Sequence, residues 1–326
     1  MTRVAELNLL NEDDASLAAR AAWLYQVGGL TQNEVATRLN VPNVKAHRLI
    51  ARAVREGMVR VFVEGDIAQC MQLEQRLRDA YGLAVCEVAP NVDDEPLPLK
   101  SLGALGARTL RLACEKGDDA VIGLGYGRTL AACVANLPRM DVKNIRFVSL
   151  LGGFTRRFAA NPFDVINRIG ERTGAEAYVL PLPFCLNSAE DRAVLMAQRG
   201  IDEVFALARS ATLRFVGIGT VGPEASLGTS GMIEPHEFAE VARNGGRGEL
   251  LGQFFDARGG RVETELSGRL ASLSYDDLKV GKLVAIAGGT AKPEAMRAVL
   301  ASGLLHGLLT DERTANALVG PAAVGR

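Results

Sequence analysis

The 326-residue sequence predicts an α/β protein with a small helical N-terminal domain and a larger domain built on a doubly wound, mostly parallel sheet. Three short helical patterns follow one another between residues 14 and 57. Beyond residue 98, apolar runs alternate with amphipathic helical stretches, as in strands that helices cover on both faces. We therefore expect the two domains to be residues 1–65 and 66–326.

The composition is that of a globular protein without a membrane segment. The chain is 48% apolar and 23% charged, its net charge is −1, and no apolar run approaches the ~20 residues that span a bilayer. The first residues lack the cationic start and apolar core of a secretory signal. The five cysteines are scattered with no C-x-x-C pair, so we expect no disulfide, no metal site and a cytoplasmic location.

The N-terminal helices are defined by their ends. Residues 14–27 carry apolar side chains at helical spacing and stop at a glycine pair. Thr31 and Glu34 have the spacing of a capping box, which predicts a short second helix. We expect a third helix over 43–57, followed by a strand over 58–63 that would form a wing.

The second and third helices meet the requirements of a helix-turn-helix. Ala36 is small enough for a close helix crossing, and Asn40 suits a turn residue in the left-handed region. Seven basic and two acidic side chains lie between residues 20 and 62, although the whole chain is nearly neutral. Such a basic segment favours binding to DNA phosphates. The alternative is a three-helix bundle that only packs against the rest of the chain.

Side chains near the start of the third helix are the candidates for contact with operator double-stranded DNA. The start of a recognition helix reads base edges, while flanking side chains hold phosphates. The residues selected in this way are Gln32, Asn43, Val44, Lys45, His47, Arg48 and Arg52. Of these, Gln32, Lys45 and Arg52 are placed for phosphates.

The remaining chain begins with an amphipathic helical pattern over 66–81, which we expect to be a linker or a dimer element. The acidic, proline-containing stretch 92–98 is a further candidate domain edge. The predicted strands are 120–124, 145–151, 177–182, 213–218, 283–287 and 304–310. The helices expected between them include 128–137, 162–172, 190–198 and 293–300.

Four glycine-containing turns follow predicted strands, at 123–129, 152–153, 217–220 and 288–289. Ligands of open parallel sheets bind at the carboxyl ends of strands, where glycine lets backbone N–H groups approach them. The first turn is no dinucleotide fingerprint, because Arg128 replaces the third glycine, and this excludes a nicotinamide-dependent oxidoreductase. The candidate ligand residues in these turns are Gly123, Gly125, Tyr126, Gly127, Arg128, Thr129, Gly152 and Gly153.

Charged side chains elsewhere could complete such a site. Lys292 follows the glycine pair 288–289 and would point its ammonium group into the crevice. Glu249 and Asp256, with Gln253 between them, could accept hydrogen bonds from sugar hydroxyls. For each of these side chains, a solvated surface role fits the sequence equally well.

The ordered motifs resemble the SorC family of bacterial sugar regulators along nearly the whole chain. Residues 20–62 are similar to that family's DNA-binding region, and 121–130, 215–220, 249–259, 284–292 and 309–312 are similar to its effector domain. The resemblance implies a fold like that of glucosamine-phosphate deaminases and ribose-phosphate isomerases, assembly into tetramers, and effector contacts from the 123–129 turn, Glu249 and Lys292. Leu151 stands where phosphosugar-binding relatives can carry an arginine, so phosphorylation of the effector is left open.

These inferences predict a homo-oligomeric transcriptional regulator that binds operator DNA, responds to a small sugar or polyol and needs no cofactor. The alternative is a sugar-phosphate isomerase or deaminase with an accessory helical domain. Its acid–base residues would have to come from Asp256, Glu249 and Lys292. The basic helix-turn-helix favours the regulator, because an isomerase has no use for it.

Overall fold

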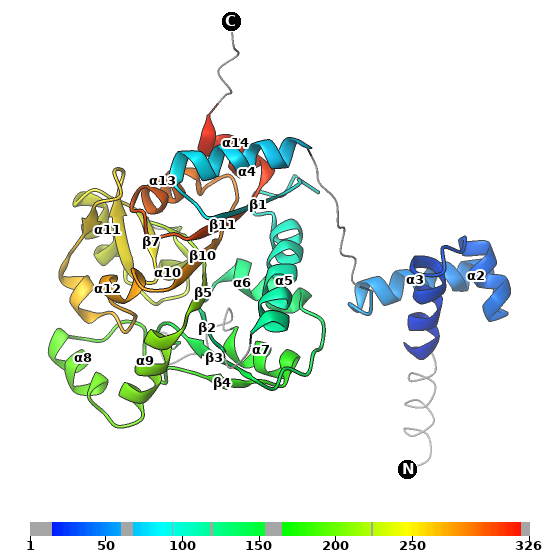
Figure 1. The fold of residues 1–326 in the computed structure, drawn as a ribbon, viewed down its shortest axis with the longest axis horizontal. Helices are drawn as coiled ribbons and strands as arrows, with labels where there is room; N and C mark the ends of the chain where they lie inside the picture. Colours follow the sequence, from blue (N-terminus) through cyan, green and yellow to red (C-terminus); the bar gives the residue numbers. More distant parts are fainter. Residues whose placement is uncertain are drawn as a thin grey trace, which may run out of the picture. The chain divides into compact units, whose positions relative to one another are not determined.

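The computed structural model describes residues 15–59, 68–92, 94–117, 120–153, 165–222 and 224–320. The chain divides into two compact units, Met1–Glu64 and Gly65–Arg326 (Figure 1). Among the described residues, no helix is both long and apolar enough to cross a membrane.

The small unit contains a helix over residues 15–26, followed by α2 (Gln32–Leu39) and α3 (Asn43–Arg55). The predicted capping box is confirmed, because the Thr31 N–H donates to the Glu34 carboxylate at 2.7 Å and the Glu34 N–H donates to the Thr31 hydroxyl at 3.4 Å. Asn40 takes the left-handed turn conformation with φ 52° and ψ 48°, as predicted. Of the predicted wing strand over 58–63, residues 60–63 lie outside the described residues, and Met58 and Val59 are not in a strand.

The large unit is built on a seven-stranded sheet in which every neighbouring pair is parallel, with strand order β1-β11-β10-β5-β2-β3-β4. Its strands are β1 (Val85–Ala89), β2 (Ala120–Leu124), β3 (Ile145–Ser149), β4 (Glu176–Tyr178), β5 (Leu213–Val216), β10 (Lys282–Ile286) and β11 (Gly307–Asp311). From β2 the chain builds outward through β3 to β4, and from β5 it builds the other way through β10 to β11. The β2–β5 boundary is therefore the topological switch point of a doubly wound sheet.

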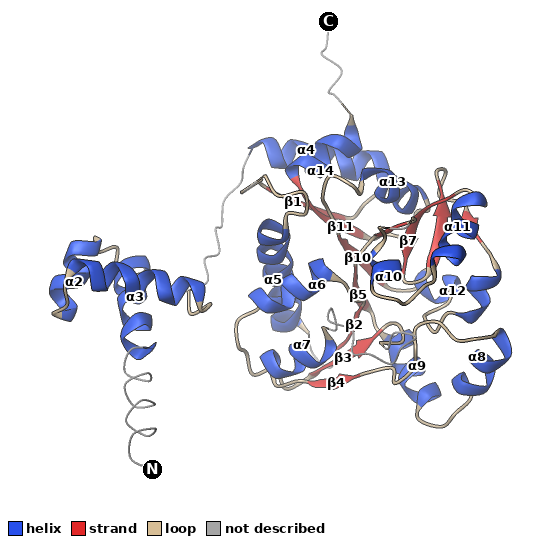
Figure 2. Ribbon diagram, turned by 180° about the vertical axis from the view of Figure 1, so that it is seen from behind, coloured by secondary structure: helices blue, strands red, loops and turns tan. Residues whose placement is uncertain are grey.

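Helices cover both faces of this sheet (Figures 1 and 2). On one face lie α5 (Leu99–Lys116), α6 (Arg128–Asn136) and α7 (Ile166–Thr173), and on the other α4 (Ala68–Tyr81), α9 (Ile201–Ser210), α13 (Pro293–Ala301) and α14 (Glu312–Val319). Each face has its own apolar core. In β2, for example, Ile122 packs in the α5–α7 core and Val121 in the other. Burial on both faces explains why the strands read as nearly continuous apolar runs.

A second, antiparallel sheet was not predicted. It has the order β6-β7-β8-β9, with β6 (Gly219–Thr220), β7 (Gly246–Leu250), β8 (Gln253–Asp256) and β9 (Arg261–Val262). Beside these strands and the first sheet lie the short elements α8 (Ala189–Met196), α10 (Ser226–Thr229), α11 (Pro235–Arg243), η1 (Glu265–Arg269) and α12 (Tyr275–Leu278). The strands of this sheet are two to five residues long, and such segments carry too weak an alternation to be seen in a sequence.

The helix expected to be a linker or a dimer element belongs to the core of the large unit. α4 packs on β1 and α14, and its Glu74 carboxylate accepts a hydrogen bond from the Val88 N–H at 2.9 Å. The proposed edge at 92–98 also lies inside this unit, because the Pro96 carbonyl accepts a hydrogen bond from the Thr290 N–H at 3.0 Å. The helix is therefore part of the large unit and not a linker, while its role in a dimer stays a prediction. The edge at 92–98 was misjudged because its partner, Thr290, is more than 190 residues away, beyond the reach of local patterns.

Candidate functional site

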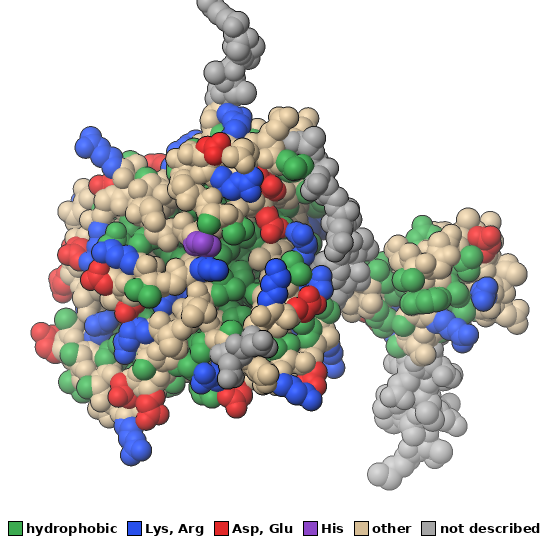
Figure 3. Space-filling model, in the orientation of Figure 1, with side chains coloured by type: hydrophobic (Ala, Val, Ile, Leu, Met, Phe, Trp, Pro, Cys, Tyr) green, Lys and Arg blue, Asp and Glu red, His purple; other side chains and the backbone are tan. Residues whose placement is uncertain are grey.

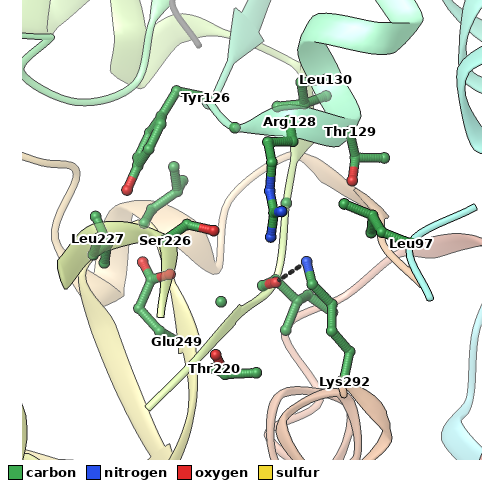
Figure 4. Close-up of a pocket in the computed structure, with 15 residues that line it drawn as sticks. Leu97, Tyr126, Arg128, Thr129, Leu130, Thr220, Ser226, Leu227, Glu249 and Lys292 are labelled. Atoms are coloured by element: carbon green, nitrogen blue, oxygen red, sulfur yellow. Dashed lines mark hydrogen bonds between the residues drawn. The ribbon is translucent and has the colours of Figure 1, made fainter. Parts of the chain in front are cut away.

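A polar pocket lies at the carboxyl ends of β2, β5 and β10, across the topological switch point (Figure 4). The β2–α6 turn, the β5–β6 connection, β7 and the start of α13 contribute to its wall. The lining residues are Leu97, Tyr126, Gly127, Arg128, Thr129, Leu130, Gly217, Ile218, Gly219, Thr220, Ser226, Leu227, Glu249, Leu251 and Lys292. The pocket therefore lies where open parallel sheets bind their ligands.

The first wall is the N-terminus of α6. Gly127 precedes the helix with φ 124° and ψ 168°, a conformation that essentially only glycine adopts, and no side chain caps the helix there. The N–H groups of the first turn and the positive end of the helix dipole thus lie at the pocket. Arg128 is exposed and Thr129 is 5% exposed, and both side chains project from this turn (Figure 4).

Lys292 forms the opposite wall, at the residue before α13. Its ammonium group donates to the Ile218 carbonyl at 2.7 Å (Figure 4). The turn that carries it is fixed from behind, because the Gly289 N–H donates to the Thr314 hydroxyl at 2.8 Å and that hydroxyl donates to Asp311 at 2.5 Å. Burial, with the nearby Arg128 charge, lowers the pKa of Lys292 to about 8, while Glu249 opposes the shift.

Glu249 is the carboxylate of the pocket. It comes from β7, is 6% exposed, and accepts a hydrogen bond from the Gly252 N–H at 2.6 Å. Gly219 makes room for it, since a Cβ on Gly219 would collide with the second carboxylate oxygen. Burial raises the pKa of Glu249 to about 7, although the Gly252 N–H and Lys292 act in the opposite direction.

The remaining polar groups of the pocket are hydroxyls. The Tyr126 side chain extends from the β2–α6 turn toward Ser226 and Glu249 (Figure 4), and burial together with the Glu249 charge raises its pKa. Thr129, Thr220 and Ser226 add three aliphatic hydroxyls. One carboxylate, two cations and four hydroxyls provide many donors and acceptors for a polyhydroxy ligand.

Four of the predicted glycines do not line the pocket. A Cβ on Gly123 would lie 2.5 Å from Leu150 Cδ2, so this glycine serves packing inside the sheet. Gly125 lies behind the pocket, where a Cβ would be 3.3 Å from Leu251 Cδ2. Gly152 and Gly153 follow β3 on the far side of β2, and the pocket is formed instead between β2 and β5.

Asp256 also lies away from the pocket. Glu249 is next to the β7–β8 turn, whereas Asp256 is at the other end of this hairpin and pairs with Gly246. Its carboxylate accepts hydrogen bonds from the Arg258 and Gly260 N–H groups, both at 2.8 Å, and so stabilises the β8–β9 turn. The structure thus brings together Tyr126, Gly127, Arg128, Thr129, Glu249 and Lys292 from the predicted ligand residues.

Sequence reasoning missed several lining residues. The 217–220 turn was recognised as a strand end, but its residues were not selected. Leu97, Ser226 and Leu227 carry no motif, and they reach the pocket only because the chain returns to this edge of the sheet. Leu251 lies within the 249–259 segment, but nothing distinguished it there from the neighbouring apolar residues.

Six of the seven predicted DNA-contact residues are exposed side chains of the small unit. In α3, Ala46, Leu49, Ile50 and Ala53 are buried, while Asn43, Lys45, His47 and Arg48 are exposed and Val44 is 74% exposed. Gln32 is exposed at the start of α2. Arg52 differs, because its guanidinium group pairs with Glu56 at 2.8 Å across one helical turn. On the visible face of the large unit, acidic and basic side chains are interspersed (Figure 3).

Comparisons with known proteins agree with this architecture. Residues 65–320 match the family model "Putative sugar-binding domain". The chain is 56% identical to the erythritol catabolism regulatory protein EryD of Brucella abortus, over 94% of this chain and 97% of that protein. It is 32% identical to the transcriptional regulator LsrR of an Enterobacter species, over 98% of this chain and 97% of that protein.

Solved structures show the same fold. Full-length SorC, the sorbitol operon regulator of Klebsiella pneumoniae, superposes with a TM-score of 0.69 at 24% identity, over 94% of this chain and all of SorC. A domain of a possible sugar-binding transcriptional regulator from Arthrobacter aurescens gives a TM-score of 0.70 at 24% identity, over 79% of this chain and all of that domain.

Among the described residues, no cluster of three or more His, Cys, Asp or Glu could hold a metal ion.

Proposed function

Because the chain belongs to the family of bacterial transcriptional regulators that carry this sugar-binding domain, we propose that it controls an operon for polyol catabolism. Residues 1–65 bind operator DNA, and residues 66–326 bind a small polyol that changes the affinity for DNA. The proposed effector is erythritol or a close analogue, as the 56% identity to the erythritol catabolism regulator suggests.

The observation that carries this proposal is the composition of the pocket. Hydroxyls, a carboxylate and an ammonium group converge at the switch point, and apolar side chains such as Leu227 and Ile218 complete the wall. The Glu249 carboxylate can accept hydrogen bonds, and the Lys292 ammonium has further N–H donors besides the one that it directs to the Ile218 carbonyl. A neutral polyol can bridge these groups with its hydroxyls, each of which both donates and accepts.

DNA binding is assigned to the exposed face of α3. Its apolar face is buried in the small unit, so Asn43, Val44, His47 and Arg48 remain available to enter a major groove. Lys45 and Gln32 lie beside them for phosphates. The Arg52 Nε–H is paired with Glu56, so only the terminal N–H groups of its guanidinium remain for a phosphate, which makes it the weakest member of the predicted set.

The proposal includes a cytoplasmic homotetramer. Operators are read by symmetric dimers of DNA-binding units, and the resemblance to SorC-type regulators extends this to four copies. Sedimentation analysis of the full chain with and without operator DNA tests the assembly.

The function is tested with the full-length protein and an operator duplex selected from genomic fragments that it retains. Erythritol should change the affinity for this duplex at least tenfold, and Lys292→Met should reduce that response. Lys279→Met is the matched control, because Lys279 is exposed and pairs with Asp276 outside the pocket. Erythritol phosphate is titrated in parallel, to determine whether the effector is phosphorylated.

Three results would contradict the proposal. They are an operator affinity that no polyol changes, an equal response of both lysine variants, and conversion of an aldose phosphate to its ketose during incubation as followed by NMR. The last result would favour the isomerase alternative.

A further inference from the structure

Leu251 has a backbone conformation that leucine rarely adopts. Leu251 and Gly252 form the two-residue loop between β7 and β8, since Leu250 and Gln253 are paired directly before and after it. Their φ angles are 50° and 78°. Positive φ at both positions is typical of type I′ hairpin turns, in which asparagine or aspartate followed by glycine is preferred.

The choice of leucine therefore needs a reason in the tertiary structure. In the left-handed region the Cβ of a branched side chain approaches the following carbonyl oxygen. Within the described residues, the non-glycine residues with positive φ are Leu251 and Asn40, and asparagine tolerates this region well. Strained residues of this kind persist where the surroundings hold them, and they gather at ligand sites.

The Leu251 side chain is buried and lines the pocket. It is 5% exposed, and a Cβ on the buried Gly125 would lie 3.3 Å from its Cδ2 atom. The same turn positions Glu249, because the Gly252 N–H donates to the Glu249 carboxylate at 2.6 Å. The strained turn thus places an apolar group and the pocket's carboxylate next to each other.

We propose that Leu251 limits the length of the polyol that the pocket accepts. Its side chain lines the pocket next to Gly125, on the turn that holds Glu249, and we expect it to leave room for a four-carbon polyol. A five- or six-carbon polyol would need the volume that the leucine fills. Asparagine would suit the turn better but would replace this apolar wall with an amide. The inference rests on the proposed function, because it specifies which member of the polyol class the same pocket prefers.

The test compares erythritol, ribitol and sorbitol by calorimetric titration of the full-length protein. The variants are Leu251→Gly, which removes the side chain and suits the positive φ, and Leu251→Met, which keeps the volume. Leu250→Ala is the matched control, because Leu250 is a fully buried neighbour in the same hairpin that does not line the pocket.

Leu251→Gly should reduce the preference for erythritol over sorbitol by about tenfold or more, as expected when a pocket loses a steric limit. Leu251→Met and Leu250→Ala should keep the wild-type ratio of dissociation constants. If Leu251→Gly keeps the wild-type ratio of dissociation constants, Leu251 does not limit the length of the polyol, and only this inference is contradicted. A wild-type protein that binds no polyol contradicts the proposed function as well, and the two failures are therefore distinguishable. If Leu250→Ala loses the preference equally, the hairpin as a whole and not Leu251 sets the limit.

Discussion

Two glycine-containing corners follow the adjacent strands β2 and β3, yet they have different roles. After β2, Gly127 opens α6 at the pocket, and a Cβ added there would have no neighbour within 4 Å. After β3, a Cβ on Gly152 would lie 2.6 Å from the Pro183 carbonyl oxygen and 2.7 Å from that of Leu182. A glycine at a strand end thus indicates either an approach for a ligand or a close crossing of two backbone segments.

The largest effect on stability is expected at the closely packed corner after β3, at Gly152. Gly152→Ala should lower the free energy of unfolding by about 3 kcal/mol, because the new methyl group meets backbone atoms that have little freedom to move. Urea denaturation measures the change. Gly153→Ala is the control, since a Cβ there has no neighbour within 4 Å and should change stability little. Equal stability of the two variants would remove the distinction between the corners.

A smaller effect is expected at the corner after β2, where Gly127 lies at the pocket. Gly127→Ala adds no steric conflict, but it strains the backbone at φ 124° by about 1–2 kcal/mol. Because the α6 N-terminus can relieve this strain by moving, erythritol should bind roughly tenfold more weakly in calorimetric titrations. Gly152→Ala, at a temperature where it is folded, should keep the wild-type affinity. If Gly127→Ala binds erythritol normally, this turn does not shape the site.

The smallest effect is the change in folding stability with pH. It arises at the pocket, which contains titratable groups, and not at the Gly152 corner, which has none. Because the pKa of folded Glu249 is raised to about 7, the folded protein keeps a proton that the unfolded chain releases above its ordinary value of 4.5. This contribution to stability therefore falls as pH rises between those values.

Wild-type protein should thus lose about 1 kcal/mol relative to Glu249→Gln between roughly pH 5.5 and 6.5. Chemical denaturation of both proteins at each pH measures this difference, and Gly152→Ala should follow the wild-type slope. Parallel slopes for wild type and Glu249→Gln would show that Glu249 does not titrate in this range.

Local patterns in the sequence were sufficient for much of the molecule. The Thr31–Glu34 capping box, the Asn40 turn and the glycine before α6 each depend on the conformation of a few consecutive residues. The positions of the central strands along the chain followed from apolar runs that need burial on both faces. Lys292 was found because it follows a recognisable strand end, and Glu249 because it lies in a segment that resembles the effector domain of the SorC family. The structure brings both to the pocket.

Only the tertiary structure decided which of these strand ends share a site. Gly152 and Asp256 looked as suitable as Gly127 and Glu249, but the pocket forms between β2 and β5, which are brought together across the sheet. The sequence also gave no reason to select Leu251. Its importance depends on a strained φ and on contact with Gly125, which lies more than 120 residues earlier in the chain. Contacts of that range depend on the packing of whole elements, and no periodicity or short motif records them.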